Sequence, residues 1–475
     1  MRNLTTDTPT TDGARIATLV SNARTALAVA ENYDQARADL LCAAAGWAIM
    51  EPSRNKMLAE LAVRETGLGN VADKIQKNHR KTLGLLRDLQ TAKSVGIISE
   101  DRVRGITEIA RPAGVVGAIT PSTNPGATPA NMIINAMKGR NAIILAPSPK
   151  GYSTAQLLVR YVHAEFDRIG APHNLVQLLP SPVSKALTYE MLAQVDLVIA
   201  TGSQANIRAA YSSGTPAFGV GAGNVAVVVD GSADVDAAAD RIVRSKIFDN
   251  ATSCSSENSM IVIDDVYGAM IAAMQREGCI LLNADEKARL QAAMFPNGKL
   301  SPVVTAKRAS EIAQLAGIDR AKDARVLMVE ETGCGEDFPF SGEKLSPVLT
   351  VYRATNFEAA TARVAEIYAH QGAGHSVGIH ASPHRAESLA LQMATLLPVA
   401  RVIVNQPHCI ATGGSFDNGL PFSLSMGCGT WGGNSFSDNL TYKNFLNITR
   451  IARPISGRVP EEAALFADYF AHVNR

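Results

Sequence analysis

The chain has 475 residues, of which 46% are hydrophobic and 19% charged, a composition typical of globular proteins with two or three domains and sizeable cores. Lys and Arg total 45 against 44 for Asp and Glu, so the formal net charge is +1, which gives no electrostatic support to a nucleic-acid or membrane-surface role. The N-terminal segment Met1–Asp7 is polar, and no run of about 18 apolar residues occurs. We therefore expect a soluble, cytoplasmic protein.

The cysteines and histidines form neither a disulfide framework nor a metal-ligand pattern. The six cysteines are scattered without Cys-x-x-Cys pairs, which argues against both disulfides and a zinc module in so large a chain. Four of the nine histidines cluster, but their spacing straddles a helix end, a glycine turn and a strand: His370, His375, His380 and His384. No cysteine or adjacent carboxylate completes a ligand set, so we predict free thiols and no metal site.

The first part of the chain has a helical pattern, followed by an exposed strand. Apolar residues recur with helical periodicity over Ala14–Ala30, Tyr33–Glu51, Pro52–Thr66 and Val71–Leu89. Residues 103–112 then mix polar and apolar side chains like an exposed strand, and Phe445–Pro454 near the C-terminus has the same character. Because native proteins avoid bare edge strands, we expect these two to pair, within one subunit or across a dimer interface, as an oligomerisation strand pair.

From Val115 the pattern changes to short apolar runs separated by helical stretches, which predicts an α/β fold with a doubly wound parallel sheet. The expected strands are Val115–Thr120, Ala142–Ala146, Leu175–Leu179, Leu197–Ala200 and Ala226–Val229. Ligands of such sheets lie at the carboxyl ends of the strands. The loops there, over 120–125, 146–150 and 201–203, are polar and suited to a nucleotide.

A second α/β unit follows. Its expected strands lie near Met260, Val326, Val348, Ser376 and Val402. We therefore divide the chain into a cofactor-binding domain over 1–229, a catalytic domain over 230–430 and a C-terminal tail with the second exposed strand over 431–475.

One cysteine lies in a polar loop between these units. The loop Asp249–Asn258 connects a probable helix, Val235–Phe248, to an apolar strand, Met260–Ile263. Cys254 there is surrounded by small hydroxyl and amide side chains, where a thiolate can be stabilised and reached by a substrate. The alternative is that Cys254 is merely a small apolar residue in a loop.

The order of these parts carries a resemblance to a known family. No Gly-x-Gly-x-x-Gly follows the first strand, but a nucleotide-type sheet, a glycine-rich segment, the loop cysteine and a second α/β unit follow one another. This order resembles the aldehyde dehydrogenase superfamily over nearly the whole chain, and in particular its CoA-acylating branch. The matching segments are 119–125, 200–203, 219–224, 248–250 ahead of Cys254, 343–348, 374–376 and 427–434.

The resemblance implies a chemistry for each segment. Cys254 would add to the aldehyde carbonyl, lose hydride to a nicotinamide and pass the resulting thioester to CoA. The oxyanion donors would be the Cys254 amide and Asn124, although a gapless match to the hydrolytic enzymes places Thr123 at the asparagine position. His375 would assist acyl transfer or the CoA thiol, or else serve a structural role.

The resemblance also implies a cofactor site. Its expected residues are Thr120, Pro121, Ser122, Lys150, Thr201, Gly202, Ser203, Gly221, Gly223 and Glu343. Glu343 would hold the nicotinamide ribose, and its alternative is a surface charge beside Lys344. Most NAD-using relatives bind the adenosine ribose with a lysine and a glutamate after the second strand. In this chain the two positions are Ala146 and Pro149, and Lys150 lies close by. Because no carboxylate repels a 2′-phosphate there, we place NADP ahead of NAD.

One absence separates the acylating from the hydrolytic enzymes. Gly219 stands where hydrolytic relatives carry the glutamate that activates water, so water should attack the thioester poorly, whereas a thiol still can. Glu257 is a rival base, but its place at the start of a strand favours a structural role. Cys428 matches family sequence and has no step left to perform.

Three further segments bear on the substrate. Three segments, 77–89, 122–131 and 250–258, are similar to acylating sulfoacetaldehyde dehydrogenases, which implies sulfoacetaldehyde and CoA as substrates. Charge-assisted donors would suit a sulfonate, and Arg401, His408 and Thr412 lie in the region that borders the pocket in relatives. Acetaldehyde or propionaldehyde is the alternative substrate, and a hydrolytic dehydrogenase or a non-enzymatic scaffold are the alternative functions. We expect a homodimer or homotetramer.

Overall fold

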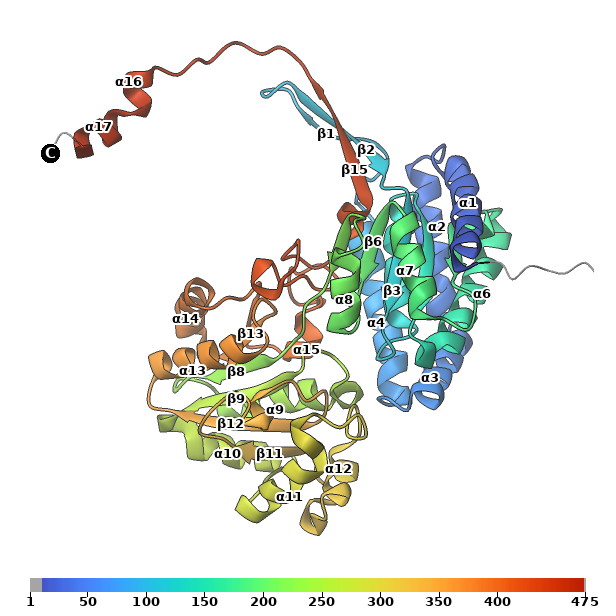
Figure 1. Ribbon diagram of the computed structural model, residues 1–475. Coiled ribbons are helices and arrows are strands. Elements are labelled where there is room, and N and C mark those ends of the chain that lie inside the picture. Colours follow the sequence, from blue (N-terminus) through green and yellow to red (C-terminus); the bar gives the residue numbers. More distant parts are fainter. Residues whose placement is uncertain (1–10, 474–475) are drawn as a thin grey trace, which may run out of the picture.

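A computed structural model describes residues 11–473, so the polar segment Met1–Asp7 lies outside the described residues. The chain forms two parallel sheets, each with helices on its faces, and a long antiparallel ribbon that projects from the first unit (Figure 1). None of the described helices combines the length and the apolar character needed to cross a membrane.

The first sheet has five parallel strands in the order β5-β4-β3-β6-β7. The strands are β3 (Val115–Thr120), β4 (Ala142–Pro147), β5 (Val176–Leu178), β6 (Leu197–Ala200) and β7 (Ala217–Gly219). The chain winds outward from β3 in one direction through α5 (Ala127–Lys138) and α6 (Tyr152–Ile169), and in the other through α7 (Lys185–Gln194) and α8 (Gln204–Tyr211). The predicted doubly wound arrangement is confirmed.

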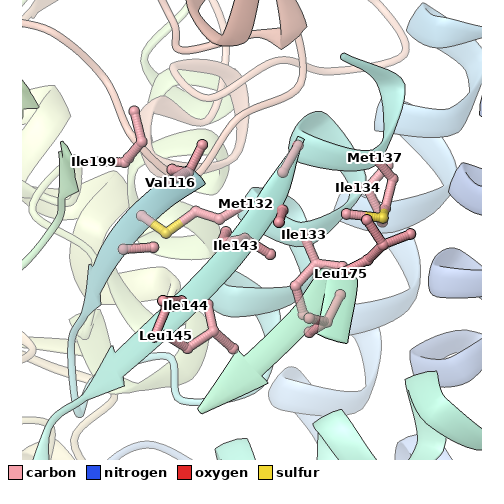
Figure 2. Close-up of a cluster of buried hydrophobic side chains, with 14 of the residues drawn as sticks. Val116, Met132, Ile133, Ile134, Met137, Ile143, Ile144, Leu145, Leu175 and Ile199 are labelled. Carbon is pink, nitrogen blue, oxygen red and sulfur yellow. The ribbon is translucent and has the colours of Figure 1, made fainter. Parts of the chain in front are cut away.

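The core of this unit lies between the sheet and α5. Every residue of α5 is buried, because the helix is covered by the sheet on one side and by α2 and α4 on the other. Figure 2 shows Met132 and Ile133 of α5 over Val116 of β3 and Ile143 of β4. Strands buried on both faces contain continuous apolar residues, as the sequence of β3 and β4 does.

Four N-terminal helices complete the first unit: α1 (Asp12–Ala30), α2 (Gln35–Met50), α3 (Pro52–Thr66) and α4 (Val71–Leu89). Local signals set their ends. The side chain of Glu51 accepts from the first amides of α3, Gly67 ends that helix at a φ of 68°, and the Asn70 side chain caps α4. The predicted helices therefore agree closely with the structure.

The second sheet has seven parallel strands in the order β10-β11-β12-β9-β8-β13-β14. They are β8 (Val225–Val229), β9 (Glu257–Ile263), β10 (Cys279–Leu281), β11 (Val326–Glu330), β12 (Val348–Ala354), β13 (Val377–His380) and β14 (Val402–Val404). The helices of this unit are α9 (Val235–Ile247), α10 (Tyr267–Arg276), α11 (Ala284–Met294), α12 (Ala309–Leu315), α13 (Phe357–His370), α14 (Pro383–Leu396) and α15 (His408–Ala411).

One predicted strand belongs to the second sheet, although its position in the sequence indicates the first. The run Ala226–Val229 was expected as a strand of the first sheet, on the cofactor side of a boundary at residue 229. In the structure β8 pairs with β9 and β13 at the centre of the second sheet, and β7 is the remaining strand of the first sheet. The physical reason is that an apolar run identifies a buried strand but not the sheet that buries it.

The two exposed strands pair within one chain. β2 (Ile106–Pro112) lies between β1 (Gly96–Asp101) and β15 (Leu446–Ala452), antiparallel to both. Beyond β15 the chain extends away from the body and ends in two short helices, α16 (Glu462–Leu465) and α17 (Ala467–Val473), as Figure 1 shows. The alternative of pairing within one subunit is therefore the one realised.

Candidate active site

A cleft of about 440 Å³ lies at the carboxyl ends of β3 and β6 and contains the loop cysteine. Because neighbouring parallel strands end at the same edge, the loops after β3 and β6 meet there, facing the glycine segment before β8 and the loop before β9. The predicted site residues that line the cleft are Thr120, Pro121, Ser122, Asn124, Thr201, Gly202, Ser203, Gly221, Gly223, Cys254 and Glu343. Lys150 is exposed and does not line it, whereas Ser148 does.

Cys254 is paired with a histidine. The Cys254 Sγ atom lies 3.4 Å from Nε2 of His375, which immediately precedes β13 with Ser376. Burial, and then the carboxylate of Glu343, raise the pKa of the Cys254 thiol. Burial, and then the Arg401 guanidinium, lower the pKa of His375 to about 3. The resting pair is therefore a neutral thiol beside a neutral imidazole, and a proton must leave the sulfur before it can act as a nucleophile.

The cysteine loop is held by a buried ion cluster. The Asp249 carboxylate accepts from Lys77 Nζ at 2.5 Å and from Lys74 Nζ at 3.0 Å. The Asp249 amide donates to Asp73 Oδ2 at 2.7 Å, and Thr252 Oγ1 donates to Asp249 Oδ2 at 2.8 Å. Burial alone would raise the pKa of Asp249, but the two ammonium groups and these hydrogen bonds lower it overall. The loop is therefore tied to one face of α4.

This cluster fixes a strained backbone. Asp249, Asn250 and Ala251 have φ values of 50°, 52° and 57°, so the first three residues of the cysteine loop are left-handed. For a residue with a Cβ this conformation costs roughly 1–2 kcal/mol. The turn lies close to Gly69, where an added Cβ would be 1.9 Å from Asp249 Oδ1. The contacts of Asp249 offset the strain and place the loop in one conformation.

Lys77, one of the two lysines that bind Asp249, also orients Asn124. Its Nζ donates to Asn124 Oδ1 at 2.8 Å. Because the carbonyl end of this amide faces Lys77, its NH₂ end remains to donate in the cleft that Asn124 lines. The neighbouring Thr123 is fixed through its backbone oxygen, which accepts from Lys74 Nζ at 3.1 Å.

The glycine segment approaches the cysteine loop too closely for side chains. A Cβ on Gly223 would lie 1.9 Å from the Cys254 backbone oxygen, and one on Gly221 would lie 2.9 Å from the Cys428 sulfur. The Gly221 amide donates to Asn434 Oδ1 at 2.8 Å. The glycines therefore let the backbone that precedes β8 form a wall of the cleft.

Glu343 faces the cleft, and its neighbour faces the interior. Glu343 Oε1 is buried and has no hydrogen-bond partner within residues 11–473. Burial raises the pKa of this carboxyl to about 8. Lys344 is fully buried and donates to the Phe340 and Gly342 carbonyls, so the two side chains do not form a surface charge pair. An unpartnered acceptor in a polar cleft is suited to the hydroxyls of a ligand.

The chain as a whole matches a known protein family. The aldehyde dehydrogenase family profile matches residues 2–411. The chain belongs to the aldehyde dehydrogenase family. It is 63% identical to the sulfoacetaldehyde dehydrogenase (acylating) of Cupriavidus necator, over 97% of this chain and 93% of the relative.

Two further relatives carry names from the same branch. The chain is 38% identical to the succinate-semialdehyde dehydrogenase (acetylating) of Clostridium kluyveri, over 92% of this chain and 95% of the relative. It superimposes on the crystal structure of an acetylating aldehyde dehydrogenase from Geobacillus thermoglucosidasius with a TM-score of 0.90 and 34% identity, over 95% of this chain and 98% of that one. The family that the sequence resembles, and its acylating branch, are thereby confirmed.

In this aldehyde dehydrogenase there is little room for a side chain at Gly219, where the resemblance places the water-activating glutamate of hydrolytic relatives. A Cβ on Gly219 would lie 2.8 Å from Ile207 Cγ2 and 2.9 Å from Tyr211 Cε2, both on α8. The Tyr211 hydroxyl accepts from the Gly219 amide at 2.9 Å and donates to the Gly219 carbonyl at 3.0 Å. The base is therefore absent, and a tyrosine occupies the space beside its backbone.

Glu257 serves the structure. It is fully buried, accepts from Ser245 Oγ at 2.5 Å and receives the His408 amide at 3.4 Å. Burial raises the pKa of its carboxyl to about 7. Glu257 does not line the cleft, so the geometry favours the structural alternative over the rival base.

The three residues considered as a border of the substrate pocket are engaged elsewhere. Arg401 donates to Asn439 and to the carbonyls of His375, Gly427 and Ser437. Thr412 Oγ1 donates to the His408 carbonyl at 2.7 Å, and His408 contacts Ser376. Their polar groups therefore position the residues around His375.

Several residues of the site were missed by the sequence. Lysines on a helix are usually solvated, so the sequence gives Lys74 and Lys77 no role. The signal it does contain is their helical spacing with Lys81 and Leu85, which places all four on the face of α4 that is buried. Tyr211 and Ser376 carried no signal, because their roles depend on the packing of segments distant in sequence.

The ion cluster predicts a large effect of one neutral substitution. Asp249→Asn leaves two buried ammonium groups without their carboxylate, and we expect a loss of about 3–5 kcal/mol in the free energy of unfolding. The exposed pair Asp240–Arg244 supplies the control, since Asp240→Asn should cost about 0–1 kcal/mol. Urea unfolding at neutral pH measures both, and equal losses for the two variants would contradict the cluster's role.

The cluster also predicts a dependence of stability on pH. The pKa of Asp249 in the folded protein is below its ordinary 3.8, so the stabilisation from its negative charge is present above pH 3.8. That stabilisation is lost as the pH falls through the folded pKa.

Proposed function

We propose that this enzyme is a CoA-acylating aldehyde dehydrogenase that oxidises sulfoacetaldehyde with NAD(P) and CoA to sulfoacetyl-CoA, through a thioester on Cys254. The observation that carries the proposal is the contact between Cys254, which lines the cleft, and the buried His375, together with the closed position 219. The 63% identity to a relative named as an acylating sulfoacetaldehyde dehydrogenase supports the substrate.

Cys254 and His375 supply the covalent chemistry. His375 Nε2 takes the thiol proton, and the Cys254 sulfur adds to the aldehyde carbonyl carbon. The negative charge on the carbonyl oxygen is stabilised by the Cys254 amide and by the Asn124 NH₂ group, which Lys77 orients. The proton taken by His375 is released to solvent when the hydride leaves. The same His375 nitrogen can then take the proton of the CoA thiol, whose sulfur replaces Cys254 in the thioester, and return it to the departing Cys254 thiolate.

The residues around the cleft fit a nicotinamide cofactor. Glu343 Oε1, a buried acceptor without a partner in the described chain, would hold the ribose hydroxyls. The glycines at 221 and 223 leave backbone against which a planar ring can lie. When bound, the cofactor supplies the acceptor for hydride. We propose NADP ahead of NAD, because Pro149 stands where most NAD-using relatives carry a glutamate that would repel a 2′-phosphate, although exposed Lys150 lies outside the cleft lining.

The acyl acceptor is determined by what the cleft lacks. Among the described residues lining the cleft, Glu343 is the one carboxylate, and Tyr211 fills the space beside Gly219. Because Glu343 is assigned to the ribose hydroxyls of the cofactor, His375 is left as the base beside the thioester. A thiol is intrinsically more nucleophilic than water and can react with modest assistance.

A sulfonate would be bound by neutral donors. The described side chains that line the cleft near Cys254 include Thr123, Asn124, Thr128 and Ser253, and no Lys, Arg or His is among them. Hydroxyl and amide donors can satisfy three sulfonate oxygens, and Lys77 orients the Asn124 amide so that its NH₂ group can donate in the cleft. We also propose a cytoplasmic homodimer or homotetramer, in which the β1-β2-β15 ribbon contributes to the contact between subunits.

The nucleophile is tested by removing its sulfur. We predict that Cys254→Ala abolishes NAD(P)H formation and leaves the protein folded, because no other thiol lines the cleft in residues 11–473. Cys334→Ala is the matched control, since that cysteine is partly exposed away from the cleft, and it should retain wild-type activity. NAD(P)H absorbance with aldehyde and CoA is the measurement, and activity in Cys254→Ala would disprove the assignment.

Restoring the glutamate alone should not create a hydrolase. We predict that Gly219→Glu costs about 1–3 kcal/mol of stability through overpacking against Tyr211 and Ile207, and that turnover still requires CoA. Tyr211→Phe is the control for loss of the hydroxyl contacts without a change of volume. Incubation with aldehyde and NAD(P) lacking CoA measures this, and many turnovers by Gly219→Glu would show that position 219 is open.

The substrate and cofactor are tested by one panel of assays. We predict that kcat/KM for sulfoacetaldehyde exceeds that for propionaldehyde by roughly 100-fold or more, because donors arranged for an anion stay unpaired with an apolar substrate. Each aldehyde is measured with NAD and with NADP, with and without CoA. Equal efficiency for the two aldehydes would remove the sulfonate from the proposal, and sustained turnover without CoA would remove the acyl acceptor.

A further inference from the structure

The C-terminal arm, residues 456–473, projects from the tip of the ribbon. β15 ends at Ala452, which pairs with Ile106 next to the turn between β1 and β2, and the chain continues outward to α16 and α17 (Figure 1). Every residue of the arm is exposed. α16 has four residues and α17 has seven, whereas an isolated helix needs about 12–15 residues to be stable in water. The two helices therefore require a surface to pack against.

The helices of the arm have an apolar face. Phe466, Tyr469, Phe470 and Val473 recur at the spacing i, i+3, i+4 and i+7, and the Phe470 amide donates to the Phe466 carbonyl at 2.9 Å. The ring centroids of Phe466 and Phe470 are 5.9 Å apart, and those of Tyr469 and Phe470 are 5.5 Å apart. The three rings are 47%, 60% and 49% exposed. This is the pattern by which an amphipathic helix binds in an apolar groove.

The remaining face of the arm is acidic. Residues 461–473 include Glu461, Glu462 and Asp468 and contain no Lys or Arg. Helices that lie on a membrane surface are rich in Lys and Arg on the polar face, so the charge argues against a lipid partner. Two arms placed side by side would also repel each other. The surface that fits the arm is apolar and is not acidic.

An apolar groove of about 670 Å³ lies on the first unit, between α2 and α4. Leu83 and Phe416 in this groove are large apolar side chains that remain exposed. An exposed apolar groove on a protein surface marks an interaction site. The apolar residues that line it are Cys42, Ala43, Leu83, Leu86, Leu89 and Phe416.

The charges around the groove complement those of the arm. Lys93, exposed beyond the end of α4, adds a positive charge to three acid–cation neighbours that balance one another. The groove side therefore has an excess of one positive charge, against three negative charges on the arm. The balanced neighbours are Asp39 with Lys138, Asp88 with Arg87, and Asp417 with Arg80.

The geometry of the ribbon separates the arm from the groove of its own chain. In Figure 1 the arm ends at the upper left, whereas α2 and α4 lie at the right. Residues 453–461, which connect β15 to α16, span roughly 30 Å when fully extended. They would first have to retrace β15, roughly 23 Å of strand, before crossing the first unit. A second copy related by a two-fold axis can present its groove to the arm, and the contact then forms twice in one dimer.

We propose that residues 456–473 are a docking arm, whose apolar face binds the groove between α2 and α4 of a second copy of this chain, while the arm of that copy binds the groove of the first. The docking arm rests on the homo-oligomer proposed above, to which it adds the surface and its occupant. It is independent of the aldehyde and of CoA.

The test changes each side of the contact in the full-length chain. Phe466→Ser combined with Phe470→Ser removes two rings of the arm, and Leu83→Glu places a charge in the groove. All three residues are exposed, so the body of the protein should stay folded, which circular dichroism checks. Leu315→Glu is the matched control, because Leu315 is a 53% exposed leucine on α12, outside the groove. Analytical ultracentrifugation over a concentration series gives the Kd of the dimer.

We expect the arm variant and Leu83→Glu each to raise the Kd of the dimer by roughly 30-fold or more, the effect of losing a central anchor of an interface. Leu315→Glu should match the unaltered chain. An oligomer whose Kd is unchanged in the arm variant or in Leu83→Glu would overturn the docking arm and leave the proposed homo-oligomer intact. A monomeric unaltered chain would overturn both.

Photo-crosslinking identifies the occupant of the groove. The crosslinking residue p-benzoylphenylalanine replaces Tyr469, and ¹⁴N-labelled and ¹⁵N-labelled chains are mixed and allowed to exchange before irradiation. Mass spectrometry should find the arm linked to peptides from α2, α4 or the segment around Phe416, with pairs that combine the two labels. Links confined to a single chain, or no link to the groove, would overturn the proposal.

Discussion

The arrangement of the site depends on one buried carboxylate, Asp249, held by two ammonium groups of a single helix. Lys74 and Lys77 lie one turn apart on the buried face of α4, so their ends converge on one point. Burial lowers the pKa of Lys74 to about 8 despite the carboxylate, and Asp73 adds a second negative charge nearby. Breaking such a pair exposes the full cost of burying the remaining charge, so the cluster behaves as a unit.

This cluster connects two parts of the site that come from different units. Lys77 contacts Asp249 at the start of the cysteine loop and Asn124 in the loop after β3. A strained turn in one unit and an amide side chain in the other are thereby fixed relative to the same helix. The separation of the cysteine loop from Asn124 is consequently set by contacts to one helix, as the proposed roles of Cys254 and Asn124 would require.

The sequence was most informative where structure is local. The bounds of α3 and α4 follow from Pro52, Gly67 and the Asn70 cap, and the family resemblance located Cys254 and His375. The sheet that contains Ala226–Val229 could not be read from an apolar run, since both sheets bury their central strands. The partners of Asp249 and the closure of Gly219 by Tyr211 depend on tertiary packing, which periodicity does not encode.

The ribbon pairs two strands that lie far apart in the sequence, which has a consequence for biosynthesis. β15 pairs with β2 across a separation of 342 residues, as the Arg450–Glu108 contact shows. During translation the five-stranded sheet can assemble soon after residue 219 emerges, yet one edge of β2 stays open until the C-terminal strand leaves the ribosome. An unpaired edge is a template for association with other nascent chains. The first unit, although made first, is therefore completed last.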